Sequence, residues 1–129
     1  MRLKNQQLNK VFGENELSLR THLKYSQAHV GRTSSVSQRT ISNIESMGEA
    51  GSVTIDVLEK LSEYYNAPAW QLLIPNVPLD APTRKAMNEL VSIFSGASPD
   101  ARRQLVEDAR RVWKNEVIKQ ELELLKSKK

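Results

Sequence analysis

Two serines, Ser26 and Ser37, constrain the fold of this chain more than any other feature. Each precedes a short run with helical spacing, where a serine hydroxyl can accept a hydrogen bond from a backbone N–H of the first helical turn. Between the runs, residues 33–35 (Thr-Ser-Ser) interrupt the pattern with residue types that favour turns. Segment 27–44 is therefore predicted to form two short helices joined by a tight turn. The apolar residues of the second helix face one core: Val36, Ile41 and Ile44.

The outward face of the second predicted helix is polar and carries no carboxylate. It presents Gln38, Arg39, Ser42 and Asn43. Arginine pairs with O6 and N7 of guanine, and glutamine or asparagine pairs with N6 and N7 of adenine, so this face suits base edges in the major groove of DNA. Two short helices that place the second in that groove make a helix-turn-helix. A solvated helix face is the alternative interpretation of the same residues.

The similarity to a known family extends well beyond these two helices. The matching segments are Phe12-Gly13-Glu14-Asn15 with Leu19-Arg20, Ser26-Gln27, Val36 to Glu45, Val57 to Leu61, and Tyr65-Asn66-Ala67-Pro68 with Leu72-Leu73. In this order and spacing, residues 12–74 resemble the Cro/cI-type (XRE-like, lambda-repressor-like) helix-turn-helix DNA-binding family. The resemblance implies an all-α fold, with a five-helix lambda-repressor-like DNA-binding domain followed by a C-terminal helical extension.

Contacts to DNA are expected from two sets of residues. Base edges are assigned to Gln38, Arg39 and Asn43, with Ser42 as a weaker candidate. Contacts to the DNA backbone are assigned to Gln27, Thr40, Arg20 and Arg32, since helix N-termini and basic side chains favour phosphate.

Three positions carry structural expectations from the resemblance. Glu45 is expected to pair with Arg20, which would hold the orientation of the reading helix. Gly31 stands where the family prefers alanine, and Ser35 stands in the turn where it prefers glycine, so Ser35 must adopt a conformation that glycine takes more easily.

The charge is unevenly distributed, although the formal net charge of the whole chain is only +4. Residues 1–44 hold seven Lys or Arg against two Glu, whereas residues 45–76 hold one Lys against five Asp or Glu. The positive half contains the candidate reading helix. Neutralisation of phosphates by such a cluster supplies much of DNA affinity and makes it salt-dependent.

The flanks of the motif carry further expectations. The first helix is expected from about Gly13 to Lys24, preceded over residues 1–11 by an arm or a short helix. Tyr25 is expected in the core. Three prolines over 75–82 predict a stiff linker. The expected domains are therefore 1–11, 12–74 (DNA-binding), 75–82 (linker) and 83–129 (helical extension).

The extension is expected to hold two helices and to associate with a second copy. Thr83 is expected to cap the first helix and Gly96 to end it, and Ser98-Pro99 begins a long last helix. Apolar residues recur on this last helix at steps of three and four, which predicts a dimerisation surface. Folding of both helices back onto the DNA-binding domain is the alternative. The candidate dimerisation residues are Leu105, Ala109, Val112, Trp113, Val117 and Leu122.

Other classes of function find little support in the sequence. The chain has no cysteine, and its two histidines, His22 and His29, stand next to no carboxylate. No metal, cofactor or catalytic site is expected, so the chain is not expected to be an enzyme. It lacks a long apolar run and a signal peptide, which predicts a cytoplasmic, nucleoid-associated protein without a membrane partner.

Two hypotheses follow for the function. The preferred one is a sequence-specific transcriptional regulator, most simply a dimeric repressor of bacterial, phage or prophage origin. It would read an inverted-repeat operator in double-stranded DNA, with half-sites one helical turn apart. The alternative is a protein-interaction module on a helix-turn-helix scaffold, an antitoxin or anti-repressor that captures a protein partner through its C-terminal helices.

Overall fold

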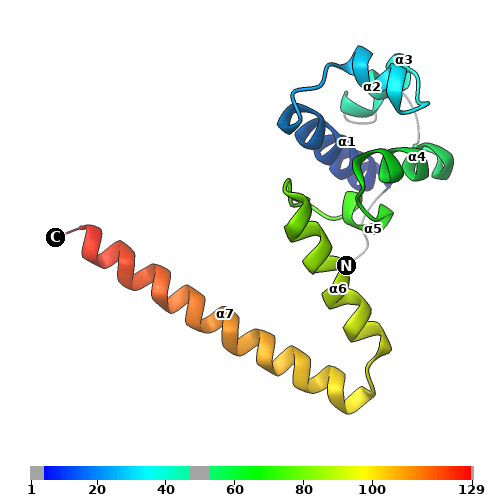
Figure 1. Ribbon diagram of the computed structural model, residues 1–129. Coiled ribbons are helices and arrows are strands. Elements are labelled where there is room, and N and C mark those ends of the chain that lie inside the picture. Colours follow the sequence, from blue (N-terminus) through cyan, green and yellow to red (C-terminus); the bar gives the residue numbers. More distant parts are fainter. Residues whose placement is uncertain (1–4, 47–52, 129) are drawn as a thin grey trace. The chain divides into compact units, whose positions relative to one another are not determined.

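The computed structural model describes residues 5–46 and 53–128, and within these ranges it holds seven α-helices and no strand (Figure 1). The all-α prediction is thereby confirmed. The chain forms two compact units that meet between Asn88 and Glu89. The helices are α1 (Asn5–His22), α2 (Gln27–Thr33), α3 (Gln38–Glu45), α4 (Ile55–Tyr65), α5 (Ala69–Leu72), α6 (Ala81–Gly96) and α7 (Pro99–Ser127).

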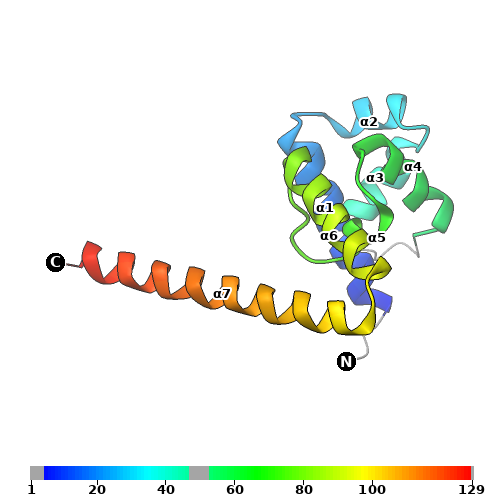
Figure 2. The same ribbon diagram turned by 60° about the horizontal axis from the view of Figure 1, so that its bottom comes forward.

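The first unit is organised around α1. Helix α3 packs against both α1 and α2, and α5 packs against both α1 and α4 (Figures 1 and 2). Apolar side chains from all five helices meet between them, and their removal from water is the main force that holds short helices together. The buried apolar residues are Phe12, Leu19, Val30, Val36, Ile41, Ile44, Leu61, Tyr65, Ala67, Leu72 and Val77.

Gly13 sets how closely α3 approaches α1. A Cβ atom built on Gly13 would lie 2.2 Å from the carbonyl oxygen of Ile44, at the end of α3. No side chain fits at that distance, so only glycine allows the C-terminal end of α3 to rest on α1. This contact helps to fix α3 on the domain.

The helix boundaries confirm most of the expected caps. Ser26, Ser37 and Ser98 each accept a hydrogen bond from a first-turn backbone N–H, as predicted for α2, α3 and α7. Thr54 caps α4 in the same way. Helix α4 ends at Asn66, which adopts a left-handed conformation with φ of 51° that asparagine tolerates.

Two local expectations are wrong. Helix α1 runs from Asn5 to His22, so residues 5–11 belong to it, and the chain leaves it through Lys24 at φ 61°. Tyr25 is not in the core: it is 36% exposed, and its ring packs on the ring of His29 at a centroid distance of 4.4 Å. The Tyr25 ring is therefore covered on one side by the ring of His29 and is not fully buried. The loop over 47–52 and residues 1–4 lie outside the described residues.

The proline-containing segment 75–82 packs against the first unit. The side-chain amide of Asn15 donates to the carbonyls of Leu72 (2.9 Å) and Ile74 (2.7 Å), and its oxygen accepts from the backbone N–H of Val77 (3.2 Å). Val77 is 5% exposed. The segment is thus tied to α1 through backbone groups, and the boundary between the units lies further along, inside α6.

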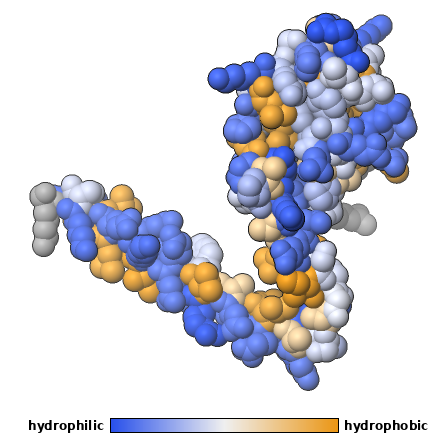
Figure 3. All heavy atoms as spheres, in the orientation of Figure 1, coloured by the Kyte–Doolittle hydropathy of each residue, from blue (hydrophilic) through white to orange (hydrophobic). Residues whose placement is uncertain are grey.

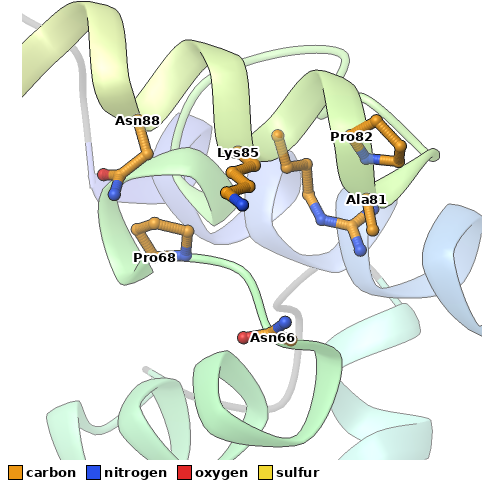
Figure 4. A pocket seen from close by; sticks show the side chains of 7 residues that line it. Asn66, Pro68, Ala81, Pro82, Lys85 and Asn88 are labelled. Atoms are coloured by element: carbon orange, nitrogen blue, oxygen red, sulfur yellow. The ribbon is translucent and has the colours of Figure 1, made fainter.

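Arg84, a buried residue at the start of α6, completes this attachment. Its guanidinium donates to the carbonyls of Pro78 (2.9 Å), Leu79 (2.7 Å) and Tyr65 (3.4 Å), and its own carbonyl accepts from the side chain of Gln71 (2.8 Å). Charged donors to carbonyl oxygens make strong hydrogen bonds, which offset the cost of burying the charge. A hollow lies beside this joint, lined by Asn66, Pro68, Ala81, Pro82, Arg84, Lys85 and Asn88 (Figure 4).

The cap of α6 differs from the prediction. Helix α6 begins at Ala81, and the carboxylate of Asp80 accepts from both the backbone N–H (2.9 Å) and the hydroxyl (2.5 Å) of Thr83. Asp80 is therefore the capping side chain, and Thr83 lies in the first turn. These hydrogen bonds hold the pKa of Asp80 below its ordinary value.

Replacing Gly13 with alanine should destabilise the protein. The added Cβ would overlap the Ile44 carbonyl, and the resulting shift should cost about 1–3 kcal/mol, more than the gain in helix propensity of about 1 kcal/mol. The matched control is Gly96→Ala, because Gly96 has no atom within 4 Å of such a Cβ. Chemical denaturation of both variants measures the difference, and a Gly13→Ala protein as stable as the control would contradict this role.

Candidate nucleic-acid interface

The turn between α2 and α3 is tight, as the sequence predicts. Ser35 lies in the left-handed region at φ 64°, and the hydroxyl of Ser34 accepts from the backbone N–H of Val36 (3.2 Å). A Cβ on Gly31 would lie 2.9 Å from the backbone nitrogen of Gln38. Glycine at this position thus allows α2 to touch the first residue of α3, which explains why this chain departs from the alanine of the family here.

The predicted reading face is largely open to solvent. Gln38, Arg39 and Asn43 are exposed, and Ser42 is half-buried. The opposite face of α3 buries Ile41 and Ile44 in the core. The helix is therefore anchored by its apolar side and presents a carboxylate-free polar side outward.

The four candidates for backbone contact fall into two groups. Arg32 is exposed on α2, and Thr40 lies in the first turn of α3, where its hydroxyl shares a hydrogen bond with that of Ser37 (2.9 Å). Arg20 and Gln27, in contrast, direct their side chains to Glu45. Arg32 is therefore open to solvent and Thr40 half-buried, whereas the side chains of Arg20 and Gln27 are committed to an interaction within the domain.

The carboxylate of Glu45 joins three helices. Arg20 on α1 donates to both of its oxygens, from Nε at 2.5 Å and from Nη2 at 3.1 Å, and Gln27 at the start of α2 donates its side-chain amide to Oε2. Arg20 also donates from Nη1 to the carbonyl of Tyr25 (2.8 Å). The expected Arg20–Glu45 pair is confirmed, and it holds the end of α3 against α1 and α2.

A second carboxyl lies beside this pair and escaped the sequence analysis. Glu16 is 1% exposed, and the hydroxyl of Tyr65 donates to its Oε1 (2.8 Å). Burial, and then the hydrogen bond to Glu45, raise the pKa of Glu16 to about 8. Burial likewise opposes ionisation of Glu45, but hydrogen bonds from Arg20, Glu16 and Gln27 outweigh it and lower the pKa of Glu45.

The raised pKa of Glu16 and the lowered pKa of Glu45 make Glu16 the carboxyl that holds a proton at neutral pH. The buried Oε2 atom of Glu16 has no hydrogen-bond partner among the described residues. The spacing of Glu16 four residues before Arg20 on one helix face could have indicated this cluster.

The predicted dimerisation residues lie along α7, where no helix packs fully over them. Trp113 is 58% exposed, and Val112, Leu122 and Ala109 are exposed as well. Leu105 and Val117 are half-buried. Figure 3 shows apolar side chains gathered along this helix and the end of α6.

A comparison with protein families supports the assignment of the motif. A family model described as helix-turn-helix matches residues 17–69, from the middle of α1 to the start of α5. The match is consistent with the resemblance of this segment to XRE-type helix-turn-helix domains. Domains of this family are typical of DNA-binding transcription regulators. Searches among curated proteins and among solved structures found no match to the chain.

Two further findings concern only the described residues, 5–46 and 53–128. None of their helices combines the length and the apolar character needed to cross a membrane. They contain no group of three His, Asp or Glu side chains arranged to hold a metal ion.

The raised pKa of Glu16 makes stability depend on pH in a defined window. The pKa of Glu16 rises on folding from its ordinary 4.5 to about 8. The contribution of Glu16 to the free energy of unfolding is therefore complete below pH 4.5 and is lost as the pH rises towards 8. Glu16→Gln keeps a neutral side chain at every pH. This variant should therefore reduce the fall in the free energy of unfolding as the pH rises. At pH 8 its free energy of unfolding should exceed that of the wild type by roughly 1–4 kcal/mol, at about 1.4 kcal/mol per pKa unit.

Urea unfolding of the wild type and of Glu16→Gln, measured from pH 5 to pH 9, checks this dependence. Glu14→Gln is the matched control, since Glu14 is an exposed carboxylate on the same helix. Wild-type and Glu16→Gln curves that decline in parallel would show that Glu16 does not hold the proton.

Proposed function

We propose that this chain is a sequence-specific transcriptional regulator that reads an operator in double-stranded DNA through α3. Gln38, Arg39 and Asn43 contact base edges in the major groove, with Ser42 as a further contact. The observation that carries the proposal is the exposed, carboxylate-free polar face of a helix whose other side is buried. The family match over residues 17–69 supports it.

The Glu45 cluster supports this assignment by holding α3 rigidly. Base recognition requires side chains to meet hydrogen-bond partners within a few tenths of an ångström, so the helix that bears them must not move on its domain. Arg20 and Gln27 restrain the last residue of α3, while Ser37 restrains the first turn. In this proposal Arg20 and Gln27 act mainly as positioning residues.

Phosphate contacts come from the residues that flank the reading face. Arg32 is exposed on the adjacent helix, and the N-terminal N–H groups of α3 carry the positive end of its dipole. Such contacts set the register of the domain on DNA without reading sequence. Thr40, in the first turn of α3, is suited to the same role.

The regulator acts as a dimeric repressor in this proposal. Residues 83–129 supply the association, and two reading helices engage an inverted repeat with half-sites one helical turn apart. Repression by occlusion of polymerase needs no effector pocket or catalysis. A single domain of this size makes few base contacts, which favours the doubled contact area of a dimer.

Selection from random duplex pools, followed by sequencing, at two salt concentrations tests the proposal. Enrichment of an inverted repeat, with affinity that falls steeply as salt rises, is the expected result. Weak binding without enrichment of any sequence would overturn the assignment of α3 as a reading helix.

Two arginines near the reading face should respond differently to substitution. Arg39→Ala should weaken binding to the selected site by about 1–3 kcal/mol and relax preference at one base pair, since a base contact is lost. Arg32→Ala should weaken binding equally on all sequences and reduce the salt slope by about one. Lys128→Ala, an exposed charge at the end of α7, is the control. Uniform loss of affinity for Arg39→Ala would mean that Arg39 contacts phosphate only.

A further inference from the structure

The second unit exposes an unusual amount of apolar surface on its two helical segments. Trp113 is 58% exposed, and Leu124 and Leu125 are 62% and 61% exposed. Side chains from the end of α6 are similarly open to solvent. Scattered exposed apolar residues are ordinary, but a continuous row along one helix marks an interaction surface. The exposed apolar residues of this unit are Leu90, Val91, Ile93, Phe94, Val106, Val112, Trp113, Ile118, Leu122, Leu124 and Leu125.

Most apolar residues of α7 fall into two rows, as the helical rotation of 100° per residue shows, and Val112 lies on neither. The first row follows the length of the helix through Val106, Ala109, Trp113, Val117 and Leu124. The second row is confined to the C-terminal half and lies on a different face. It consists of Ile118, Leu122 and Leu125. One partner helix packed along α7 would cover only the first row, so burial of the second row requires another surface.

That other surface is present at the opposite end of α7. A groove of about 250 Å³ opens between α6 and α7, and all of its lining residues are apolar. Arg102 fixes its base by donating to the carbonyls of Phe94 (2.9 Å) and Ser95 (2.7 Å). The lining residues are Leu90, Val91 and Phe94 from α6 and Leu105, Val106 and Ala109 from α7.

The charges on α7 indicate what covers these surfaces. Residues 101–114 carry five Arg or Lys against two Asp or Glu, whereas residues 115–125 carry three Glu against one Lys. The helix is thus basic in its first half and acidic in its second. A parallel pair of such helices would bring like charges together, and an antiparallel pair would bring opposite charges together.

We propose that α7 pairs antiparallel with α7 of a second copy of this chain, about a two-fold axis near Trp113. The proposal deepens the dimer of the proposed function by naming its contact surface and orientation. In this register a residue of one copy lies at the same height along the helix axis as the residue of the second copy whose number brings the sum to 226. Arg103 then comes within one helical turn of Glu121 and Glu123 of the second copy, and Lys119 comes within one turn of Glu107 and Asp108.

The same register fills the groove. Residues 117–121 of the second copy lie level with residues 105–109, where α6 and α7 diverge. The second apolar row, which includes Ile118 and Leu122, is thereby brought beside Leu90 and Phe94. The dimer unit becomes a bundle of α7 from each copy flanked by the end of α6 from each copy. Both apolar rows are buried in it, and the basic half of each α7 lies beside the acidic half of the other.

Disulfide trapping tests the orientation directly, because the chain has no cysteine of its own. Antiparallel pairing sets Ala109 opposite Val117, while two copies of either residue lie about 12 Å apart along the axis. A mixture of Ala109→Cys and Val117→Cys proteins should therefore form a mixed disulfide, and each protein alone should form almost none. Efficient disulfides within each single variant would show a parallel pair and overturn the proposal.

Charge reversal provides an independent test in solution. Sedimentation should show a dimer for the wild type and a Kd raised severalfold for Arg103→Glu. Mixing Arg103→Glu with a Glu121→Lys/Glu123→Lys protein should restore association as a heterodimer. Lys128→Glu, beyond the paired segment, should leave the Kd unchanged. A monomeric wild-type protein, or no recovery on mixing, would overturn the antiparallel dimer.

Failure of this inference is separable from failure of the proposed function. Sequence-selective binding that depends on Arg39 would persist in a chain that pairs otherwise or remains monomeric, since the α3 face lies in the first unit. Failure of the antiparallel trapping, with sequence-selective DNA binding intact, overturns only the antiparallel pairing of α7. Intact antiparallel trapping without any selectivity overturns only the reading of DNA.

Discussion

The position of α3 depends on one carboxylate, that of Glu45. It accepts from Arg20 on α1 and from Gln27 on α2, so three helices meet at a single group at the end of α3. A partly buried ion pair adds little net stability, because desolvation offsets the attraction, but it restricts geometry. Gly13 acts at the same place by allowing the Ile44 carbonyl to lie against α1. Together the two features define where the polar face of α3 points.

Local signals explain why much of this domain could be predicted from the sequence. A serine before a helical run caps it through contacts within three residues, and such caps are predicted correctly for α2, α3 and α7. The same holds for the polar face of α3, which follows from helical spacing alone. The Arg20–Glu45 pair spans 25 positions in the sequence and was predicted from the family resemblance rather than from spacing.

Contacts between side chains and distant carbonyls were not predictable in this way. Asn15 binds backbone groups 57 to 62 positions away, and Arg84 holds the carbonyls of Pro78 and Leu79. Nothing in composition distinguishes a buried arginine of this kind from a solvated one. As a result a proline-containing stretch that indicates a linker is part of the first unit, and the boundary falls within α6. The α1 start was missed because residues 5–11 lack an apolar row.

The proton that Glu16 holds in the folded chain also has a thermal consequence. At neutral pH the folded chain holds this proton, whereas the unfolded chain, with both carboxyls near their ordinary pKa, releases it. Unfolding therefore transfers a proton to the buffer, and the buffer's own heat of ionisation enters the measured enthalpy. The unfolding enthalpies measured in phosphate and in Tris will therefore differ by the difference between the two buffers' heats of ionisation, so a single buffer reports the protein and its surroundings together.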